Sequence, residues 1–253
     1  MTTQNSLEDL SSVLANRRWQ WRRRPFPHVV AQRVFVPDVY QRLTAAFRAI
    51  MDQRDDRSYN AKHDFVGASL TQASAGDLSI FLSRGWHDAI TGTFGVETTG
   101  QVTAGLHRHL PGSRHGFPHN DIVPEQLGDR NRPGEVVTHP SMGGRQANVG
   151  SRVRAIAAIY YLNNGPWHPG DGGETGLYLN WDDPVTEPVA RVPPINNSLL
   201  AFECNPYSYH SFLANRRRRD SVIVFFFRDV ADFVELWGPD GLQQYAEGGR
   251  DAR

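Results

Sequence analysis

The sequence has only one cysteine, Cys204, and only one lysine, Lys62, among its 253 residues. A single cysteine cannot form an intrachain disulfide, so the chain fits a reducing compartment. The first residues show no basic segment followed by an apolar one, so no secretory signal is expected. No apolar run approaches the ~20 residues of a membrane span. These absences predict a cytoplasmic protein with no membrane partner.

The chain also lacks net charge, because 27 basic residues balance 27 acidic ones. Binding to a phosphate backbone requires a basic surface, so nucleic acid is not an expected partner. A length of 253 residues is enough to bury a substantial core, and β-barrels of this length often form one domain. We expect a single domain that is a monomer or a homodimer.

Basic and aromatic residues alternate near the N-terminus, between Arg17 and Arg24. Such a segment is typical of a nucleic-acid-binding arm, but it also fits a solvated lead-in whose tryptophans pack on the domain. We favour the second interpretation. It assigns residues 1–24 to the lead-in, 25–246 to the domain and 247–253 to a tail.

Apolar residues spaced by three and four predict two helices in the first hundred residues. One is expected to be capped by Asp38, and the second runs from Asp77. After about residue 99 the chain consists of short β-rich runs separated by proline and glycine, which indicate an antiparallel sandwich or barrel. These runs are Gln101–Leu110, Arg154–Leu162, Thr175–Leu179, Ser198–Phe202 and Ser221–Phe227.

A long stretch between Ile122 and Ser151 is rich in glycine, proline and polar residues. Irregular segments of this length within a compact domain are usually functional lids or disordered. We predict that residues 122–151 form a lid inserted into the domain.

The triplet His119-Asn120-Asp121 is a candidate metal-binding motif. In an extended segment, residues i and i+2 project to the same face, so an imidazole and a carboxylate can bind one ion. A later histidine would complete a set of two histidines and one carboxylate, which leaves coordination positions open. His210 is our candidate, because a strand-like segment with a buried pattern follows it.

In that following segment, Arg219, Ser221, Ile223 and Phe225 share one face by alternation. An arginine and a hydroxyl on the inner wall of a barrel would be costly without an anionic partner. A guanidinium is suited to binding a carboxylate through two N–H groups, with Ser221 donating a further hydrogen bond. Arg219 is therefore predicted to anchor a ligand, whereas residues 216–218 fit a solvated turn.

Taken in order, these motifs resemble the Fe(II)- and 2-oxoglutarate-dependent oxygenases, and among them the prolyl-4-hydroxylase-like branch. The resemblance covers roughly residues 25–230. It implies a mainly β fold with flanking helices around a double-stranded β-helix (jelly-roll, cupin-like) core. The motifs that carry it are His119-x-Asp121, Ile159-Tyr160-Tyr161-Leu162-Asn163, Gly172-Gly173-Glu174, and His210 with Arg219-x-Ser221.

The resemblance implies that His119, Asp121 and His210 bind Fe(II). It also implies 2-oxoglutarate and O2 as cosubstrates and ascorbate as a stimulant. The implied reaction converts 2-oxoglutarate to succinate and CO2 while an unactivated C–H bond is hydroxylated. Halogenases similar to these enzymes have a small residue in place of Asp121, so we predict hydroxylation or desaturation and not chlorination.

The distal carboxylate of the cosubstrate is expected at Arg219, supported by Ser221 and by the hydroxyl of Tyr161. Related enzymes often have tyrosine just before the Pro-Gly turn, where this chain has Leu110. One accessory hydrogen bond to the cosubstrate is therefore not expected here.

The substrate class is predicted as a small polar molecule, such as an amino acid or a natural-product intermediate. The long insertion differs from the tight connection expected in prolyl hydroxylases, so their substrate cannot simply be transferred. The alternatives are a peptidyl or protein prolyl-type hydroxylase, a nucleic-acid-directed oxygenase, and a cupin-like metal-binding protein without 2-oxoglutarate. The last would use the pair His107-x-His109, for which we find no matching glutamate at short spacing.

Overall fold

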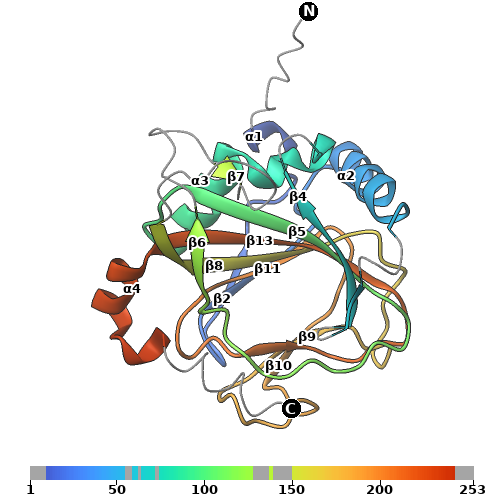
Figure 1. The fold of residues 1–253 in the computed structure, drawn as a ribbon. Coiled ribbons are helices and arrows are strands. Elements are labelled where there is room, and N and C mark those ends of the chain that lie inside the picture. The colour runs from blue at the N-terminus through green and yellow to red at the C-terminus, as the bar shows by residue number, and fades with distance from the viewer. Residues whose placement is uncertain are drawn as a thin grey trace, which may run out of the picture.

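The computed structural model describes residues 10–54, 59–61, 64–71, 74–127, 137–138 and 150–242. Within these ranges two β-sheets face each other across a barrel interior, and α1, α2 and α3 cover the outer face of the larger sheet (Figure 1). The helices are α1 (Leu10–Val13), α2 (Pro37–Met51), α3 (Arg84–Phe94) and α4 (Val230–Trp237), with a 3₁₀-helix at Gly76–Leu82.

The larger sheet has the strand order β1-β2-β11-β8-β13-β5-β4-β3, with β6 paired to β8 and β7 to β5. Among its described pairings only that of β5 with β7 is parallel. Its strands are β1 (Gln20–Arg22), β2 (His28–Gln32), β3 (Tyr59–Asn60), β4 (Phe65–Leu70), β5 (Gln101–His109), β6 (Pro124–Leu127), β7 (Val137–Thr138), β8 (Gly150–Tyr161), β11 (Ser198–Glu203) and β13 (Arg219–Asp229).

The smaller sheet has the order β10-β9-β12 and is antiparallel throughout. This arrangement confirms the predicted mainly β fold with flanking helices around a double-stranded β-helix core. Its strands are β9 (Thr175–Leu177), β10 (Ala190–Val192) and β12 (His210–Phe212).

Alternation along the central strand β13 divides its side chains between two cores. Val222 and Val224 are buried in the core beneath the helices. Ile223 and Phe225 face the barrel interior, where they pack with residues of β8, β9 and β11. This period-two pattern is the one that predicted which face of the strand carries Arg219.

The first predicted helix begins differently from the expectation. Helix α2 starts at Pro37, and its cap is Val36, which makes no side-chain capping bond. Proline is well suited to the first helical position because the missing N–H would have no partner there. The prediction that Asp38 caps this helix is therefore wrong; Asp38 lies in the first turn, where its charge favours the helix dipole.

The helical pattern that starts at Asp77 is divided into two helices. Ser83 separates the 3₁₀-helix from α3, and its Oγ accepts a hydrogen bond of 3.1 Å from the N–H of Trp86. A serine in this position satisfies one of the free N–H groups at the start of a helix. Spacing alone did not reveal this division, because the apolar residues continue on one side across it.

The N-terminal tryptophans contact the domain, as the favoured interpretation predicts. The ring of Trp19 lies 6.3 Å from that of Trp86, and the ring of Trp21 lies 5.0 Å from that of Phe94. Strand β1 extends the larger sheet at its edge by pairing with β2.

The segment predicted as an irregular lid contains two strands, β6 and β7. Strand β6 runs antiparallel to β8, with Glu125 opposite Arg152. Residues 128–136 and 139–149 of the predicted lid, and the predicted tail 247–253, lie outside the described residues. No helix in the described part of the chain is long and apolar enough to cross a membrane.

Candidate active site

Backbone pairing places His119 and His210 side by side. The N–H of His119 donates to the carbonyl of His210 at 3.0 Å, and the N–H of His210 donates back at 2.9 Å. Residues directly opposite each other in an antiparallel pair project to the same side. The two imidazole centroids accordingly lie 4.5 Å apart.

Asp121 completes a cluster with these two histidines. Its Oδ2 lies 3.3 Å from Nε2 of His210, and its Oδ1 lies 4.0 Å from Nε2 of His119. One ligand atom from each of the three residues lies within 4.8 Å of the others. The structure therefore brings together the three residues predicted to bind the metal.

Hydrogen bonds fix which nitrogen of each imidazole faces the cluster. Nδ1 of His119 lies 2.9 Å from the carbonyl oxygen of Phe117, and Nδ1 of His210 lies 3.1 Å from that of Ser208. A carbonyl oxygen can only accept, so each Nδ1 carries a proton and each Nε2 is the nitrogen directed towards Asp121. Metal-ligating histidines are commonly oriented in this way, so the donor set fits a metal ion.

The carboxyl of Asp121 is buried, and burial alone would raise its pKa. Nearby positive charge outweighs that effect and holds the pKa of Asp121 well below its usual range. The carboxylate is therefore ionised at neutral pH, as a metal ligand must be. The groups that lower this pKa are His210, Arg154 and His119.

Arg219 lies on the inner wall of the barrel with 4% of its surface exposed. Its Nη2 donates to Oγ1 of Thr175 at 3.2 Å, while its Nε has no partner among the described residues. No carboxylate of the described residues forms an ion pair with it. A buried cation without a counter-charge is costly, so this site fits an anionic ligand.

Two further predicted groups lie beside Arg219. Ser221 and Tyr161 are opposite each other in the pairing of β13 with β8. The Oγ of Ser221 is buried and has no partner among the described residues, and the Tyr161 hydroxyl is 2.7 Å from Oγ1 of Thr175. The predicted carboxylate anchor thus has a free hydroxyl at Ser221 and a bonded one at Tyr161.

Thr175, which the sequence reasoning missed, connects Arg219 with Tyr161 through its hydroxyl. It directly follows the Gly-Gly-Glu motif, and by alternation it lies on the same face of β9 as Leu177, which packs in the barrel interior. That alternation was the sequence signal from which Thr175 could have been identified.

The Gly-Gly segment lets the chain approach the strand that carries Arg219. Gly172 has a φ of +75°, and a Cβ there would lie 2.0 Å from the carbonyl oxygen of Ala214. Only glycine fits this conformation and this close approach. Gly173 lies alongside, where a Cβ would be 3.6 Å from the Cβ of Arg219.

His107 and His109 do not form a second metal site. The ring of His107 stacks on Phe65 at 3.9 Å, and the ring of His109 stacks on Phe212 at 3.7 Å. Within the described residues, the only cluster suited to a metal is that of His119, Asp121 and His210. The cupin-like alternative therefore has no support from the H-x-H pair.

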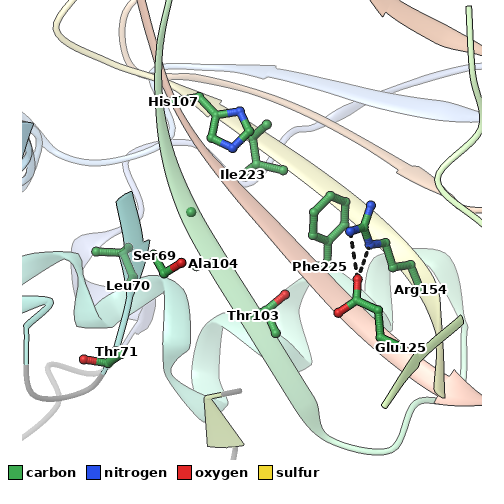
Figure 2. A pocket seen from close by; sticks show the side chains of 11 residues that line it. Ser69, Leu70, Thr71, Thr103, Ala104, His107, Glu125, Arg154, Ile223 and Phe225 are labelled. Carbon is green, nitrogen blue, oxygen red and sulfur yellow. Dashed lines mark hydrogen bonds and ion pairs between the residues drawn. The ribbon is translucent and has the colours of Figure 1, made fainter. Parts of the chain in front are cut away.

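A cavity of about 250 Å³ lies on the inner face of the larger sheet. Figure 2 shows Arg154 lying over Phe225 and joined to Glu125 on one side of it, with His107 and Ile223 further along. Arg154 connects the cavity to the cluster, because its Nη1 donates to Oδ1 of Asp121 at 3.0 Å. The remaining lining residues are Ser69, Leu70, Thr71, Thr103, Ala104 and Gly105.

Comparison with solved structures shows the same fold in several enzymes. A prolyl 4-hydroxylase from Phytophthora capsici aligns with a TM-score of 0.54 and 19% identity over 80% of this chain; the chain spans 59% of that protein. A Pseudomonas putida prolyl-4-hydroxylase aligns with a TM-score of 0.52 and 19% identity, over 88% of this chain and 96% of the other. SnoK, a non-heme alpha-ketoglutarate-dependent carbocyclase from nogalamycin biosynthesis, aligns with a TM-score of 0.54 and 14% identity, over 79% of each chain.

No curated protein sequence matches the chain. A family model described as the 2OG-Fe(II) oxygenase superfamily matches residues 104–228, which include the cluster, the Gly-Gly-Glu segment and Arg219. This match, the shared fold and the His–Asp–His geometry all point to the same class of enzyme. Residues 104–228 are thus similar to the 2OG-Fe(II) oxygenase superfamily, and this similarity indicates an enzyme that uses Fe(II), 2-oxoglutarate and O2.

Proposed function

We propose that this enzyme hydroxylates an unactivated C–H bond of a small polar molecule, such as an amino acid or a natural-product intermediate. The reaction is coupled to conversion of 2-oxoglutarate to succinate and CO2. One observation carries the proposal: Arg219 is a buried cation without a described anionic partner, in the same barrel as the His–Asp–His cluster. A dicarboxylate cosubstrate supplies the missing charge.

His119, Asp121 and His210 would hold the iron through two imidazole nitrogens and one carboxylate oxygen. Bound iron, together with 2-oxoglutarate and O2, supplies the oxidant that replaces C–H by C–OH. The protein's own contribution is positioning and the exclusion of water. The backbone carbonyls behind the two histidines keep their Nε2 lone pairs directed at the metal position.

Arg219 would bind the distal carboxylate of 2-oxoglutarate, using Nε and its remaining N–H groups. Ser221 would donate a hydrogen bond to the same carboxylate, which satisfies its buried hydroxyl. Tyr161 supports this end of the site through Thr175, whose hydroxyl contacts Arg219 as well. The position before the Pro-Gly turn adds nothing comparable, because Leu110 has no hydrogen-bonding side chain.

The cavity supports a small substrate. Pockets that bind drug-sized ligands typically measure about 300–1,000 Å³, and the cavity of about 250 Å³ lined by described residues is smaller than that range. Its lining combines hydroxyls and charged groups with the apolar surfaces of Ile223 and Phe225. Such a mixture suits a small molecule with both polar and aliphatic parts.

Asp121 sets the expected outcome of the reaction. An aspartate in this position occupies the coordination place that a halide would need, so we propose hydroxylation or desaturation. Turnover in the presence of chloride is expected to give no chlorinated product, and chlorination would refute this part of the proposal.

The test is substrate-stimulated release of succinate by the enzyme loaded with Fe(II) and 2-oxoglutarate. Amino acids and pathway intermediates form one set of candidates, and proline-containing peptides form the other. We expect stimulation by a member of the first set and none in H210A. Stimulation by the peptides alone would favour the prolyl-type alternative and overturn the small-molecule assignment.

A further inference from the structure

Arg154 lies between the metal cluster and the predicted insertion, and nothing in the reaction above assigns it a role. It belongs to β8, and its side chain is 20% exposed. Its Nη1 contacts Oδ1 of Asp121 at 3.0 Å, while its Nε and Nη2 contact Oε1 of Glu125 at 2.8 and 2.7 Å. The guanidinium thus joins a metal ligand to a residue of β6.

The contact with Arg154 makes the two carboxylate oxygens of Asp121 unequal. Oδ1 accepts the hydrogen bond from the guanidinium, whereas Oδ2 faces Nε2 of His210 at 3.3 Å. An oxygen that already accepts a charge-assisted hydrogen bond is a poorer metal donor than a free one. Oδ2 is therefore left as the oxygen directed at the metal position.

Arg154 is itself held in place from two sides. Its guanidinium lies 3.8 Å from the ring centroid of Phe225, within the range of a cation–π contact. Glu125 fixes its other edge through the two contacts to Oε1. A guanidinium remains protonated at physiological pH, so the positive charge of Arg154 is permanent.

We propose that Arg154 is a positioning residue that makes Asp121 bind the metal through one oxygen, and that Glu125 of the insertion keeps Arg154 in that position. Glu125 is then part of the support of the metal site as well as of the cavity wall. This inference rests on the proposed iron site.

The experiment is an anaerobic titration of the metal-free full-length protein with Co(II), a spectroscopic substitute for Fe(II). It measures the dissociation constant and the visible d–d spectrum, whose intensity and shape report the coordination number. The variants are R154Q and a matched control, R152Q. Arg152 lies on the same strand but pairs with Asp229 and Gln101, away from the cluster.

R154Q is expected to bind Co(II) roughly 10- to 100-fold more weakly, as is usual when a group supporting a metal ligand is removed. Its d–d spectrum should differ from that of the parent, because Asp121 can then bind through both oxygens. R152Q should keep the parent's affinity within about two-fold and its spectrum. An unchanged spectrum in R154Q, at any affinity, would overturn the proposal.

Two further variants keep the test decisive if R154Q does not fold. E125Q should weaken Co(II) binding by a smaller factor, and R154K should partly restore the parent spectrum because lysine supplies one charged donor. In that case, a parent-like spectrum and affinity in E125Q would overturn the proposal. Failure of the parent protein itself to bind Co(II) would instead refute the iron site, so the two failures are distinguishable.

Discussion

Adjacent residues of β13 carry opposite charges to opposite faces of the larger sheet, and only one of them has a complete set of partners. Asp220 faces the helices, where Nε and Nη2 of Arg108 donate to it at 3.0 and 3.2 Å and Nδ2 of Asn163 donates at 2.7 Å. Arg219 faces the barrel, where its hydrogen-bond partner among the described residues is the hydroxyl of Thr175.

The two faces of the sheet show how a buried charge that stabilises the fold, Asp220, differs from one that is suited to binding a ligand, Arg219. The Asp220 cluster continues to α2, because Arg108 also contacts Asp52 at 2.8 Å and Asn163 accepts from Arg48 at 2.6 Å. Buried polar groups are normally bonded, so a satisfied cluster needs only the fold to explain it. A buried arginine whose Nε has no hydrogen-bond partner requires a counter-charge, and an anionic ligand provides it.

The largest expected effect is at the metal cluster, on the ligand-binding side of the comparison. H210A should abolish succinate formation and metal binding while leaving the melting temperature of the metal-free protein nearly unchanged. The matched control is H168A, because the side chain of His168 is 66% exposed and lies outside the cluster. Retained turnover in H210A would refute the proposed ligand set.

The next largest effect is expected at Asp220, on the helix-facing side of the sheet, and it concerns the free energy of unfolding. Removing Asp220 leaves Arg108 with one of its two acidic partners, and breaking a buried ion pair costs about 3–5 kcal/mol. Burial raises the pKa of Asp220, and Arg108 offsets part of that rise. Urea unfolding of D220A should show this loss, whereas D182A, in an exposed loop, should not. A loss below about 1 kcal/mol would show that the cluster is not structural.

Arg219 should show the reverse behaviour. R219Q should weaken 2-oxoglutarate binding by about 1.5–3 kcal/mol, or roughly 10- to 150-fold, because a charged hydrogen-bonding group is lost. It should not lower the free energy of unfolding of the ligand-free protein, because an uncompensated buried charge has been removed. Calorimetric titration and urea unfolding measure the two quantities. Destabilisation of ligand-free R219Q as large as that of D220A would remove the distinction between the two faces.

The smallest effect is expected at Ser221. S221A should weaken 2-oxoglutarate binding by about 0.5–1.5 kcal/mol and leave the stability of the ligand-free protein unchanged or raised. S198A is the matched control, because the Ser198 hydroxyl donates to the carbonyl of Ile195 at 2.6 Å and lies outside the anchor. We expect S198A to lose stability and to bind 2-oxoglutarate normally; the opposite pattern would contradict the assignment.

Periodicity and local motifs were sufficient to predict much of the fold. The five β-rich runs correspond to β5, β8, β9, β11 and β13, with ends that differ by up to four residues. The His119–Asp121–His210 cluster could be anticipated because i and i+2 share a face, and Arg219 because charge on an inward face needs a partner.

Contacts between distant segments could not be predicted in this way. Arg154 meets Glu125 because β6 returns along β8, a pairing that leaves no local pattern in an irregular-looking segment. The Asp220 cluster depends on α2 lying over the sheet, which places Asp52 against Arg108. The break at Ser83 was missed because a capping serine and an ordinary polar residue look alike within an amphipathic pattern.

The most direct test of the central claim is the anaerobic visible spectrum of the protein mixed with Fe(II) and 2-oxoglutarate. A weak metal-to-ligand charge-transfer band is expected, and it should be lost or much reduced in R219A at a 2-oxoglutarate concentration that half-saturates the parent. The absence of the band in the parent protein, or an unchanged band in R219A, would contradict the assignment of the cosubstrate site.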